Sequence, residues 1–290
     1  MSTGPAESAV TVAALLAEAR ARLPLPDARI DAELLLAHVL GWSRTQLFAH
    51  PGMEVESAAH NRCLALLERR RDGEPLAYLL GHQEFWSLDL LIDGSTLVPR
   101  PETELLVELA LEQGAAGVVE VLDLGTGSGA IALALASERP AWRVLGIDRD
   151  AAAVQLARVN AAQLGLSNAV FAIGDWFAGL GARRFGLIVA NPPYIAAGDP
   201  CLGAPGVCRE PVHALVSGVD GLDALRHVAA TASIHLEPGG WLLCEHGAMQ
   251  GGAVRELFGT AGLEAIRTCR DLAGHERVTL GRHDGALTHE

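Results

Sequence analysis

From residue 102 onward the sequence alternates short apolar runs with longer amphipathic segments, and this alternation constrains the fold more than any other feature. The apolar runs have the length and composition of buried strands. Segments such as "DAAAVQLARVNAAQLG" place apolar residues three and four positions apart, as one face of a helix does. The expected strands read "VVEVLDLG", "WRVLGID", "AVFAIGD", "FGLIVA", "GWLLCEHG", "EAIRTCR" and "RVTLG". This order predicts an α/β fold with a mostly parallel sheet and helices on both faces.

The first part of the chain predicts a small helical bundle. "ESAVTVAALLAEARARL" has helical spacing, and "DARIDAELLLAHVLG" opens with Asp27 as an expected N-cap and closes with Gly41. A short helix is expected after Ser43, and a longer one ends at Gly73. The segment "FWSLDLLIDGSTLVPRP" follows, in which Asp93-Gly94 is a dipeptide typical of hairpin turns, so we expect a β-hairpin that turns there.

Charge and hydropathy argue against a nucleic-acid or membrane partner. The chain carries 22 basic residues, all Arg, against 35 acidic residues, a net charge of −13. Proteins that bind duplex phosphates usually present a basic face, and no basic run of that kind occurs here. The sequence contains no run of eighteen apolar residues and no export pattern in "MSTGPAESAV", so we expect a cytoplasmic protein.

The cysteine pattern argues against a metal site. The five cysteines are odd in number and widely spaced, and no CxxC or HxxxH pair occurs. Neither a bound metal nor a disulfide framework is therefore expected. Cys244 lies in the run "WLLCEHG" and is interpreted as a small core residue.

A glycine-rich loop follows the first expected strand of the sheet. In "DLGTGSGA", Gly125, Gly127 and Gly129 allow a tight turn and a close approach of the backbone to a ligand. The following helix points its free amide groups at the same place. Asp148 ends the next strand, where an acid can accept hydrogen bonds from both ribose hydroxyls. These features fit either NAD or S-adenosylmethionine.

The later loops favour S-adenosylmethionine over a nicotinamide. An oxidoreductase that uses nicotinamide or flavin normally needs a proton-transfer residue, and no candidate pair follows the fourth strand. Asp175-Trp176 instead places an aromatic ring beside an acid, which suits the packing of an adenine. Trp176 is alternatively a core aromatic, and Asp148 is alternatively an N-cap for the helix after Asp150.

The fourth strand ends in "ANPPYI", whose residue types suit the methylation of a planar NH2 group. The lone pair of such a nitrogen is delocalised, so the group needs orientation more than it needs a base. We expect the Asn191 side-chain oxygen and the Pro192 carbonyl to accept the two N–H bonds, with the diproline fixing the carbonyl direction. Tyr194 offers a face for the flat group. The alternative is a simple turn that ends the strand.

With these residues in view, the chain resembles the glutamine N5-methyltransferases of peptide chain release factors, over about residues 13–282. The resemblance rests on "DAELLLAHVLG", "GEPLAYLLG", "EFWSLDL", "LVPRPETELLVE", "VLDLGTGSGAIALALA", "ANPPYI", "CEHG" and "CRDLAGHERVTLGR". It implies a helical N-terminal domain over residues 1–80 that recognises the release factor and a linking β-hairpin over 81–100. It further implies a class I, Rossmann-like methyltransferase domain with a seven-stranded sheet over 101–284, followed by a tail over 285–290.

The resemblance also implies the site residues. Contacts to S-adenosylmethionine fall on Gly125, Thr126, Gly127, Ser128, Gly129, Asp148, Trp176 and Asn191. Contacts to the substrate amide fall on Asn191, Pro192, Pro193 and Tyr194, with Asn191, Pro192 and Tyr194 serving catalysis. The implied acceptor is the glutamine of the Gly-Gly-Gln tripeptide in release factors. We expect the protein to act as a monomer, without a metal.

The sequence departs from the family pattern at one place and leaves several alternatives open. "GVCREP" has Cys208 where the family usually has an arginine, and Arg209 stands beside it, so the departure concerns a contact that orders residues 196–211. DNA adenine N6-methyltransferases and RNA guanine N2-methyltransferases use the same NPPY logic. The net charge disfavours both. A flavin- or nicotinamide-dependent oxidoreductase and a non-catalytic adaptor that binds release factors are further alternatives.

Overall fold

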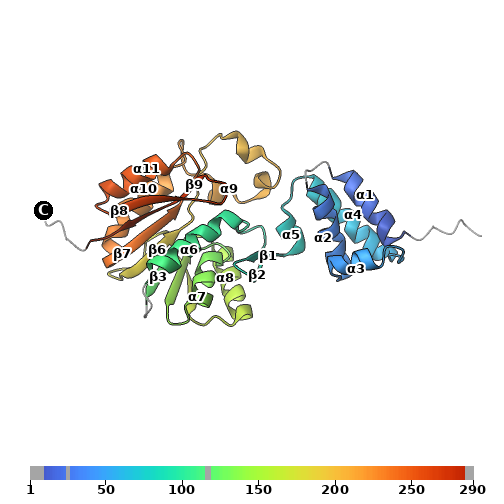
Figure 1. The fold of residues 1–290 in the computed structure, drawn as a ribbon, viewed down its shortest axis with the longest axis horizontal. Coiled ribbons are helices and arrows are strands. Elements are labelled where there is room, and N and C mark those ends of the chain that lie inside the picture. The colour runs from blue at the N-terminus through green and yellow to red at the C-terminus, as the bar shows by residue number, and fades with distance from the viewer. Residues whose placement is uncertain (1–9, 24–26, 115–118, 285–290) are drawn as a thin grey trace, which may run out of the picture. The chain divides into compact units, whose positions relative to one another are not determined.

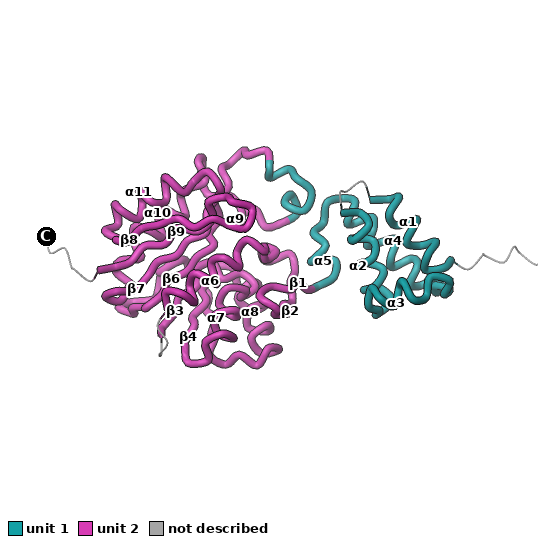
Figure 2. Tube along the Cα trace, viewed as in Figure 1, with its two compact units in different colours: residues 1–81, 201–209 teal, residues 82–200, 210–290 magenta. Residues whose placement is uncertain are grey.

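The computed structural model describes residues 10–23, 27–114 and 119–284, so the expected tail over 285–290 lies outside the described residues. The chain divides into two compact units (Figure 2). The first comprises residues 1–81 and 201–209, and the second comprises residues 82–200 and 210–290. No helix among the described residues is long and apolar enough to cross a membrane.

The first unit is a bundle of short helices around an apolar core. Its helices are α1 (Val12–Arg22), α2 (Ala28–Leu40), α3 (Arg44–Ala49), α4 (Ser57–Arg71) and α5 (Leu76–Leu80). Leu15, Leu35 and Leu67 are fully buried in one cluster. The left-handed Gly41 ends α2 and the Ser43 capping box begins α3, as the sequence predicts, whereas Asp27 stands at the N-cap of α2 without a side-chain capping bond.

Residues 201–209 pack with this helical unit, although they lie far from it in sequence. They contain the 3-10 turns η2 (Pro200–Gly203) and η3 (Val207–Arg209). The Gly206 amide donates to the Gly73 carbonyl at 3.0 Å, and Arg209 Nε donates to the Asp72 carbonyl at 3.3 Å. Arg209, beside the Cys208 that departs from the family pattern, therefore anchors this segment through a backbone carbonyl.

The second unit begins with a two-stranded hairpin. Strands β1 (His82–Phe85) and β2 (Leu88–Leu91) pair antiparallel, with Phe85 opposite Leu88. The turn consists of Trp86 and Ser87, whose φ angles of 52° and 58° match the right-handed twist of the strands.

The expectation that the hairpin turns at Asp93-Gly94 is wrong. Asp93 lies beyond the end of β2, where its carboxylate accepts from the Ser95 amide at 2.9 Å and its carbonyl accepts from Thr96. The dipeptide therefore forms a local turn without a following strand. The true turn at Trp86 is held by a distant residue, because Glu104 Oε1 accepts from the Trp86 amide at 2.9 Å.

A seven-stranded, mostly parallel sheet forms the centre of the second unit, which confirms the predicted α/β fold (Figure 1). The spatial order is β5-β4-β3-β6-β7-β9-β8, and β9 runs in the direction opposite to that of the other six strands. The strands are β3 (Glu120–Leu124), β4 (Arg143–Asp148), β5 (Ala169–Ile173), β6 (Phe185–Ala190), β7 (Leu236–Glu245), β8 (Glu264–Arg270) and β9 (Glu276–Arg282).

Helices cover both faces of this sheet (Figure 1). Leu122 and Leu124 of β3 share a core cluster with Val228 of α10 and Phe258 of α11, and Asp123, which points to the other face, is also fully buried. The helices are α6 (Glu104–Gln113), preceded by the 3-10 turn η1 (Pro101–Thr103), then α7 (Ala130–Glu138), α8 (Ala151–Leu164), α9 (Val212–Leu215), α10 (Asp223–His235) and α11 (Gly251–Thr260).

Substitution of Gly146 in β4 should be strongly destabilising. A Cβ there would lie 2.5 Å from the Phe171 ring and 2.6 Å from Thr126 Oγ1 in the glycine-rich loop. We expect Gly146→Ala to lower the free energy of unfolding by about 1–3 kcal/mol, as overpacking does, in urea denaturation. Gly94→Ala is the control, because a Cβ at that exposed glycine meets nothing within 4 Å. Equal stability of the two variants would contradict this account of the packing.

Candidate active site

A cavity of about 390 Å³ lies at the carboxyl ends of the parallel strands. Ligands of open α/β sheets bind at this edge. The loops that follow β3, β4, β5 and β6 all contribute to its lining. The predicted site residues in the lining are Gly125, Thr126, Gly127, Ser128, Asp148, Trp176, Asn191 and Pro193.

The glycine-rich loop is held against the end of β4 by its backbone amides. The amides of Gly125 and Thr126 donate to the Ile147 carbonyl at 2.8 and 3.0 Å, and the Gly127 amide donates to Asp148 Oδ2 at 2.9 Å. Gly125 and Gly127 have φ angles of 71° and 54°, which favour glycine. At these two positions the loop therefore presents backbone without side chains to the cavity.

Gly129 does not line the cavity. It is the N-cap of α7, with a φ of 85°, and a Cβ at this position would lie 3.1 Å from both Leu133 and Phe171. Its need for glycine therefore comes from conformation and helix packing.

Asp148 joins the glycine-rich loop to the start of α8. Its Oδ1 accepts from the Asp150 amide at 3.0 Å, while Oδ2 holds Gly127. The N-cap of α8 is Asp150, which accepts from the Ala152 amide at 2.8 Å, so Asp148 is not the cap. Each carboxylate oxygen of Asp148 retains a further lone pair for a ligand hydroxyl.

Trp176 lines the cavity from the loop after β5. It is half-buried, has a φ of 50°, and also packs against the core cluster beneath the sheet edge. Its ring centroid lies 6.2 Å from that of His227. The structure thus gives Trp176 both a core contact and a cavity face.

The "NPPY" segment leaves the end of β6 at the cavity. Asn191 and Pro193 line the cavity, whereas Pro192 is buried and Tyr194 packs against the core cluster. Asn191 Nδ2 donates to Thr103 Oγ1 at 3.1 Å. This bond orients the amide and leaves Oδ1, the acceptor oxygen, for another donor.

Two residues that the sequence analysis did not single out support this segment. Thr103 is 4% exposed and lies in the motif "PRPETE", and Glu245 is 1% exposed and lies in the motif "CEHG". The Tyr194 hydroxyl donates to Glu245 Oε1 at 3.3 Å. Both residues belong to motifs that carried the family resemblance, which was the available signal.

The environment of Glu245 perturbs its ionisation. Burial raises the pKa of Glu245 to about 7, and the Thr103 hydroxyl, the Arg277 guanidinium and the Tyr194 hydroxyl oppose that rise. Burial and the neighbouring Glu245 charge raise the pKa of Tyr194. The phenol therefore stays protonated at neutral pH and can donate its hydrogen bond to Glu245.

A second buried carboxyl lies under the glycine-rich loop. Asp123 is fully buried, and Thr126 Oγ1 donates to its Oδ2 at 2.6 Å. Burial raises the pKa of Asp123 to about 7, the Thr126 hydrogen bond lowers it, and the nearby Asp148 charge raises it further.

Among the described residues, no group of three or more His, Cys, Asp or Glu side chains is arranged to hold a metal ion.

Comparison with known proteins finds family models that match both the N-terminal part and the later part of the chain. Residues 13–81 match the family model described as the PrmC N-terminal domain, and residues 117–258 match a methyltransferase domain. A release factor glutamine methyltransferase of Xylella fastidiosa is 51% identical over 94% of this chain and 98% of that protein. Those of Pseudomonas aeruginosa and Escherichia coli are 53% and 48% identical, over 89% and 88% of this chain and 93% and 92% of those proteins.

Solved structures show the same fold at lower identity. A methyltransferase from Pyrococcus furiosus is 20% identical and aligns with a TM-score of 0.51 over 68% of this chain and 89% of that chain. A Thermus thermophilus 16S rRNA N2 G1207 methyltransferase, solved with AdoMet and guanosine, is 24% identical. It also has a TM-score of 0.51, over 69% of this chain and 49% of that one.

The raised pKa of Asp123 predicts a pH dependence of stability. In the folded protein this carboxyl keeps its proton up to about pH 7, whereas the unfolded chain releases it near the ordinary value of 3.8. The folded state therefore binds more protons between these values, so the free energy of unfolding falls as the pH rises through them.

Asp123→Asn removes this contribution, because the amide does not ionise. Between pH 5 and pH 8 the variant should lose about 2 kcal/mol less unfolding free energy than the parent protein, measured by urea denaturation. Asp27→Asn serves as the control, since Asp27 is exposed and makes no capping hydrogen bond. Identical pH profiles for the Asp123 variant and the parent would show that Asp123 is ionised in the folded protein.

Proposed function

The chain belongs to the family of release factor glutamine methyltransferases, and we propose that it methylates the side-chain amide nitrogen (N5) of the glutamine in the Gly-Gly-Gln tripeptide of peptide chain release factors. The methyl donor in this proposal is S-adenosylmethionine. The observation that carries the proposal is the identity of about half over nearly the whole chain to relatives of that name. The cavity at the strand ends, with Asn191 on its wall, supports it.

The residues of the cavity fit S-adenosylmethionine. The volume of about 390 Å³ lies within the usual range for small-molecule sites. The bare backbone of the glycine-rich loop admits the close approach of a ligand, and a Cβ on Gly125 would approach the Trp176 ring. We assign Asp148 to the ribose hydroxyls and Trp176 to the adenine. When bound, the donor supplies an electrophilic methyl carbon on a sulfonium sulfur.

The residues at the end of β6 orient the acceptor. A carboxamide nitrogen is a poor nucleophile because its lone pair is delocalised. In the proposal, Asn191 Oδ1 and the Pro192 carbonyl accept its two N–H bonds and direct the lone pair toward the donor. Thr103 supports this role, because its bond engages Asn191 Nδ2 and leaves the amide oxygen as the acceptor for the substrate. The amide nitrogen releases one proton after the transfer, so orientation and proximity provide most of the catalysis.

The proposal also covers the other acceptor contacts, the role of the helical unit and the state in which the protein acts. Pro193 and the Tyr194 ring contact the flat acceptor group, and the helical first unit recognises the body of the release factor. The protein acts in the cytoplasm as a monomer, without a metal and without direct binding of nucleic acid. The net charge of −13 supports the last point, since phosphate binding requires a basic face.

Mass spectrometry of a release factor tests the proposed function directly. We expect incubation with the protein and an isotopically labelled donor to add one methyl group to the glutamine of the tripeptide. A release factor with that glutamine replaced is the control and should stay unlabelled. Label in added DNA or RNA, with none in the release factor, would overturn the proposal in favour of a nucleic-acid methyltransferase.

Asn191→Ala should separate acceptor orientation from donor binding. Loss of an acceptor that engages the substrate amide removes about 1–3 kcal/mol, so kcat should fall by a factor between about 5 and about 150. The dissociation constant of S-adenosylmethionine, measured by calorimetry, should change much less. Full turnover by this variant would eliminate the acceptor role of Asn191.

Asp148→Ala should instead weaken the binding of the methyl donor. Its carboxylate is assigned to two ribose hydroxyls, and hydrogen bonds to charged groups contribute about 1.5–3 kcal/mol, so the donor should bind at least about tenfold more weakly. Asp150→Asn is the matched control, because an Asn retains the N-cap of α8 and Asp150 does not line the cavity. Unchanged donor affinity in Asp148→Ala would refute the ribose assignment.

A further inference from the structure

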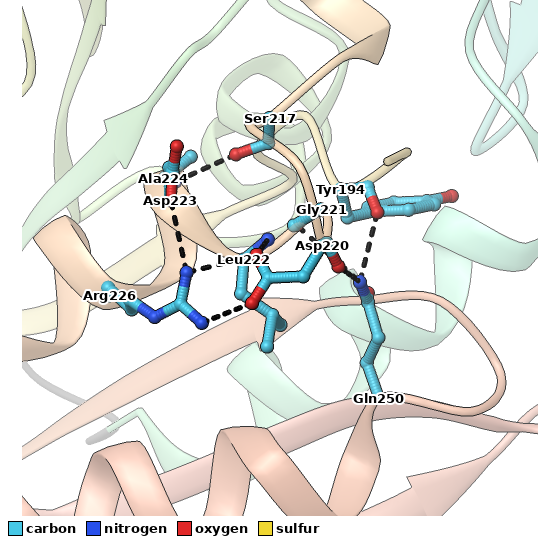
Figure 3. A network of polar contacts seen from close by, with 9 residues as sticks. All are labelled: Tyr194, Ser217, Asp220, Gly221, Leu222, Asp223, Ala224, Arg226 and Gln250. Atoms are coloured by element: carbon cyan, nitrogen blue, oxygen red, sulfur yellow. Dashed lines mark hydrogen bonds and ion pairs between the residues drawn. The ribbon is translucent and has the colours of Figure 1, made fainter. Parts of the chain in front are cut away.

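Tyr194 is held at its hydroxyl by the last residue of β7 and at its backbone carbonyl by the segment that follows this strand. Figure 3 shows the second of these contacts, to Gln250. Its hydroxyl donates to Glu245 Oε1 at 3.3 Å, and its backbone carbonyl accepts from Gln250 Nε2 at 3.0 Å. Glu245 ends β7, and Gln250 is the N-cap residue of α11. The motif "CEHG" and the glutamine shortly after it therefore contact one residue of the "NPPY" segment.

The Gln250 side chain links three backbone segments. Its Oε1 accepts from the Gly247 amide at 2.9 Å. Its Nε2 lies 3.0 Å from the Tyr194 carbonyl and 3.5 Å from the carbonyls of Asp220 and Gly221. The uncharged amide supplies an acceptor at one atom and a donor at the other, which neither a carboxylate nor a thioether does, so the residue type matters.

The Asp220–Gly221 turn that Gln250 reaches makes further polar contacts of its own (Figure 3). Arg226 pairs with the carboxylates of Asp220 and Asp223, and the Asp220 carboxylate accepts from the Leu222 amide. Gly221 has a φ of 79°, and a Cβ there would lie 2.3 Å from the Tyr194 carbonyl oxygen. The Tyr194 carbonyl is thus enclosed between a fixed turn and the Gln250 amide.

We propose that Gln250 is a positioning residue for methyl transfer, which sets the direction of the Asn191–Tyr194 turn through the Tyr194 carbonyl. The inference rests on the proposed function, because the Pro192 carbonyl is the acceptor that the turn must aim. Thr103 holds the first residue of the turn and Gln250 holds the last. The ring of each proline fixes its φ, so few backbone rotations remain between these anchors.

The alternative role for Gln250 is purely structural, in holding the loop before α11 through its bond from the Gly247 amide, since its side chain makes no capping bond to the helix. That role predicts a loss of stability with no selective effect on turnover. A positioning role predicts that donor binding and stability persist while kcat falls, because misdirection of one carbonyl affects only the acceptor. The two roles therefore differ in how kcat, KM and donor affinity respond.

The test uses Gln250→Met and Gln250→Glu in the full chain. Methionine has a similar length and no donor, and glutamate retains Oε1 as an acceptor but places a charge against three carbonyl oxygens. We expect kcat for release factor methylation to fall at least about tenfold in both variants. The dissociation constant of S-adenosylmethionine should stay within about twofold. Met249→Ala is the control, because the adjacent Met249 side chain is 96% exposed.

The melting temperature of each variant shows whether it is folded at the assay temperature, and only a folded variant tests the inference. If Gln250→Glu unfolds at the assay temperature, Gln250→Met, which buries no charge, provides the test. A kcat within about twofold of the parent in a folded variant would overturn the inference, as would a parallel loss of donor affinity. Absence of methylation by the parent protein would instead reject the proposed function, so the two failures are distinguishable.

Discussion

The carboxyl ends of the parallel strands β3, β4, β5 and β6 meet at one edge of the sheet, and the candidate site depends on this constraint. Each strand delivers one loop to the same cavity, so residues far apart in sequence become neighbours. Hydrogen bonds from backbone amides then connect the loops, as when the Gly127 amide donates to the Asp148 carboxylate. The site is therefore assembled by the sheet, and its side chains add chemistry to an existing cavity.

Buried polar side chains beneath the cavity fix the orientation of the loops that line it. Asp123 accepts from the Thr126 hydroxyl under the glycine-rich loop, and Glu245 accepts from the Tyr194 hydroxyl next to the Asn191–Tyr194 turn. Both carboxyls are almost inaccessible to solvent, and burial raises the pKa of each to about 7. Because buried polar groups are costly unless they are hydrogen-bonded, such contacts favour a single arrangement of the loops.

The expectations for regular strands and helices agree with the structure more closely than those for turns, whose position depends on distant partners. The seven strands lie where the sequence predicted them, and the signal is clearest for β3, β4 and β6, because a buried strand needs apolar residues throughout. The hairpin turn was placed wrongly, because Asp93-Gly94 has turn chemistry while Glu104, distant in sequence, holds the true turn at Trp86. The contact of Gly129 with the methyl donor stays a prediction, while the close approach of Leu133 and Phe171 also requires a glycine at this position.

The sequence by itself determined the order of strands and helices, the glycine-rich loop and the rigid turn, since apolar period, glycine and proline act within a few residues. Only the tertiary structure decided which side chains support that turn. Thr103, Glu245 and Gln250 lie 88, 51 and 56 residues from the turn residues that they contact. No local pattern specifies such pairs, because only the folded sheet and its loops bring them together.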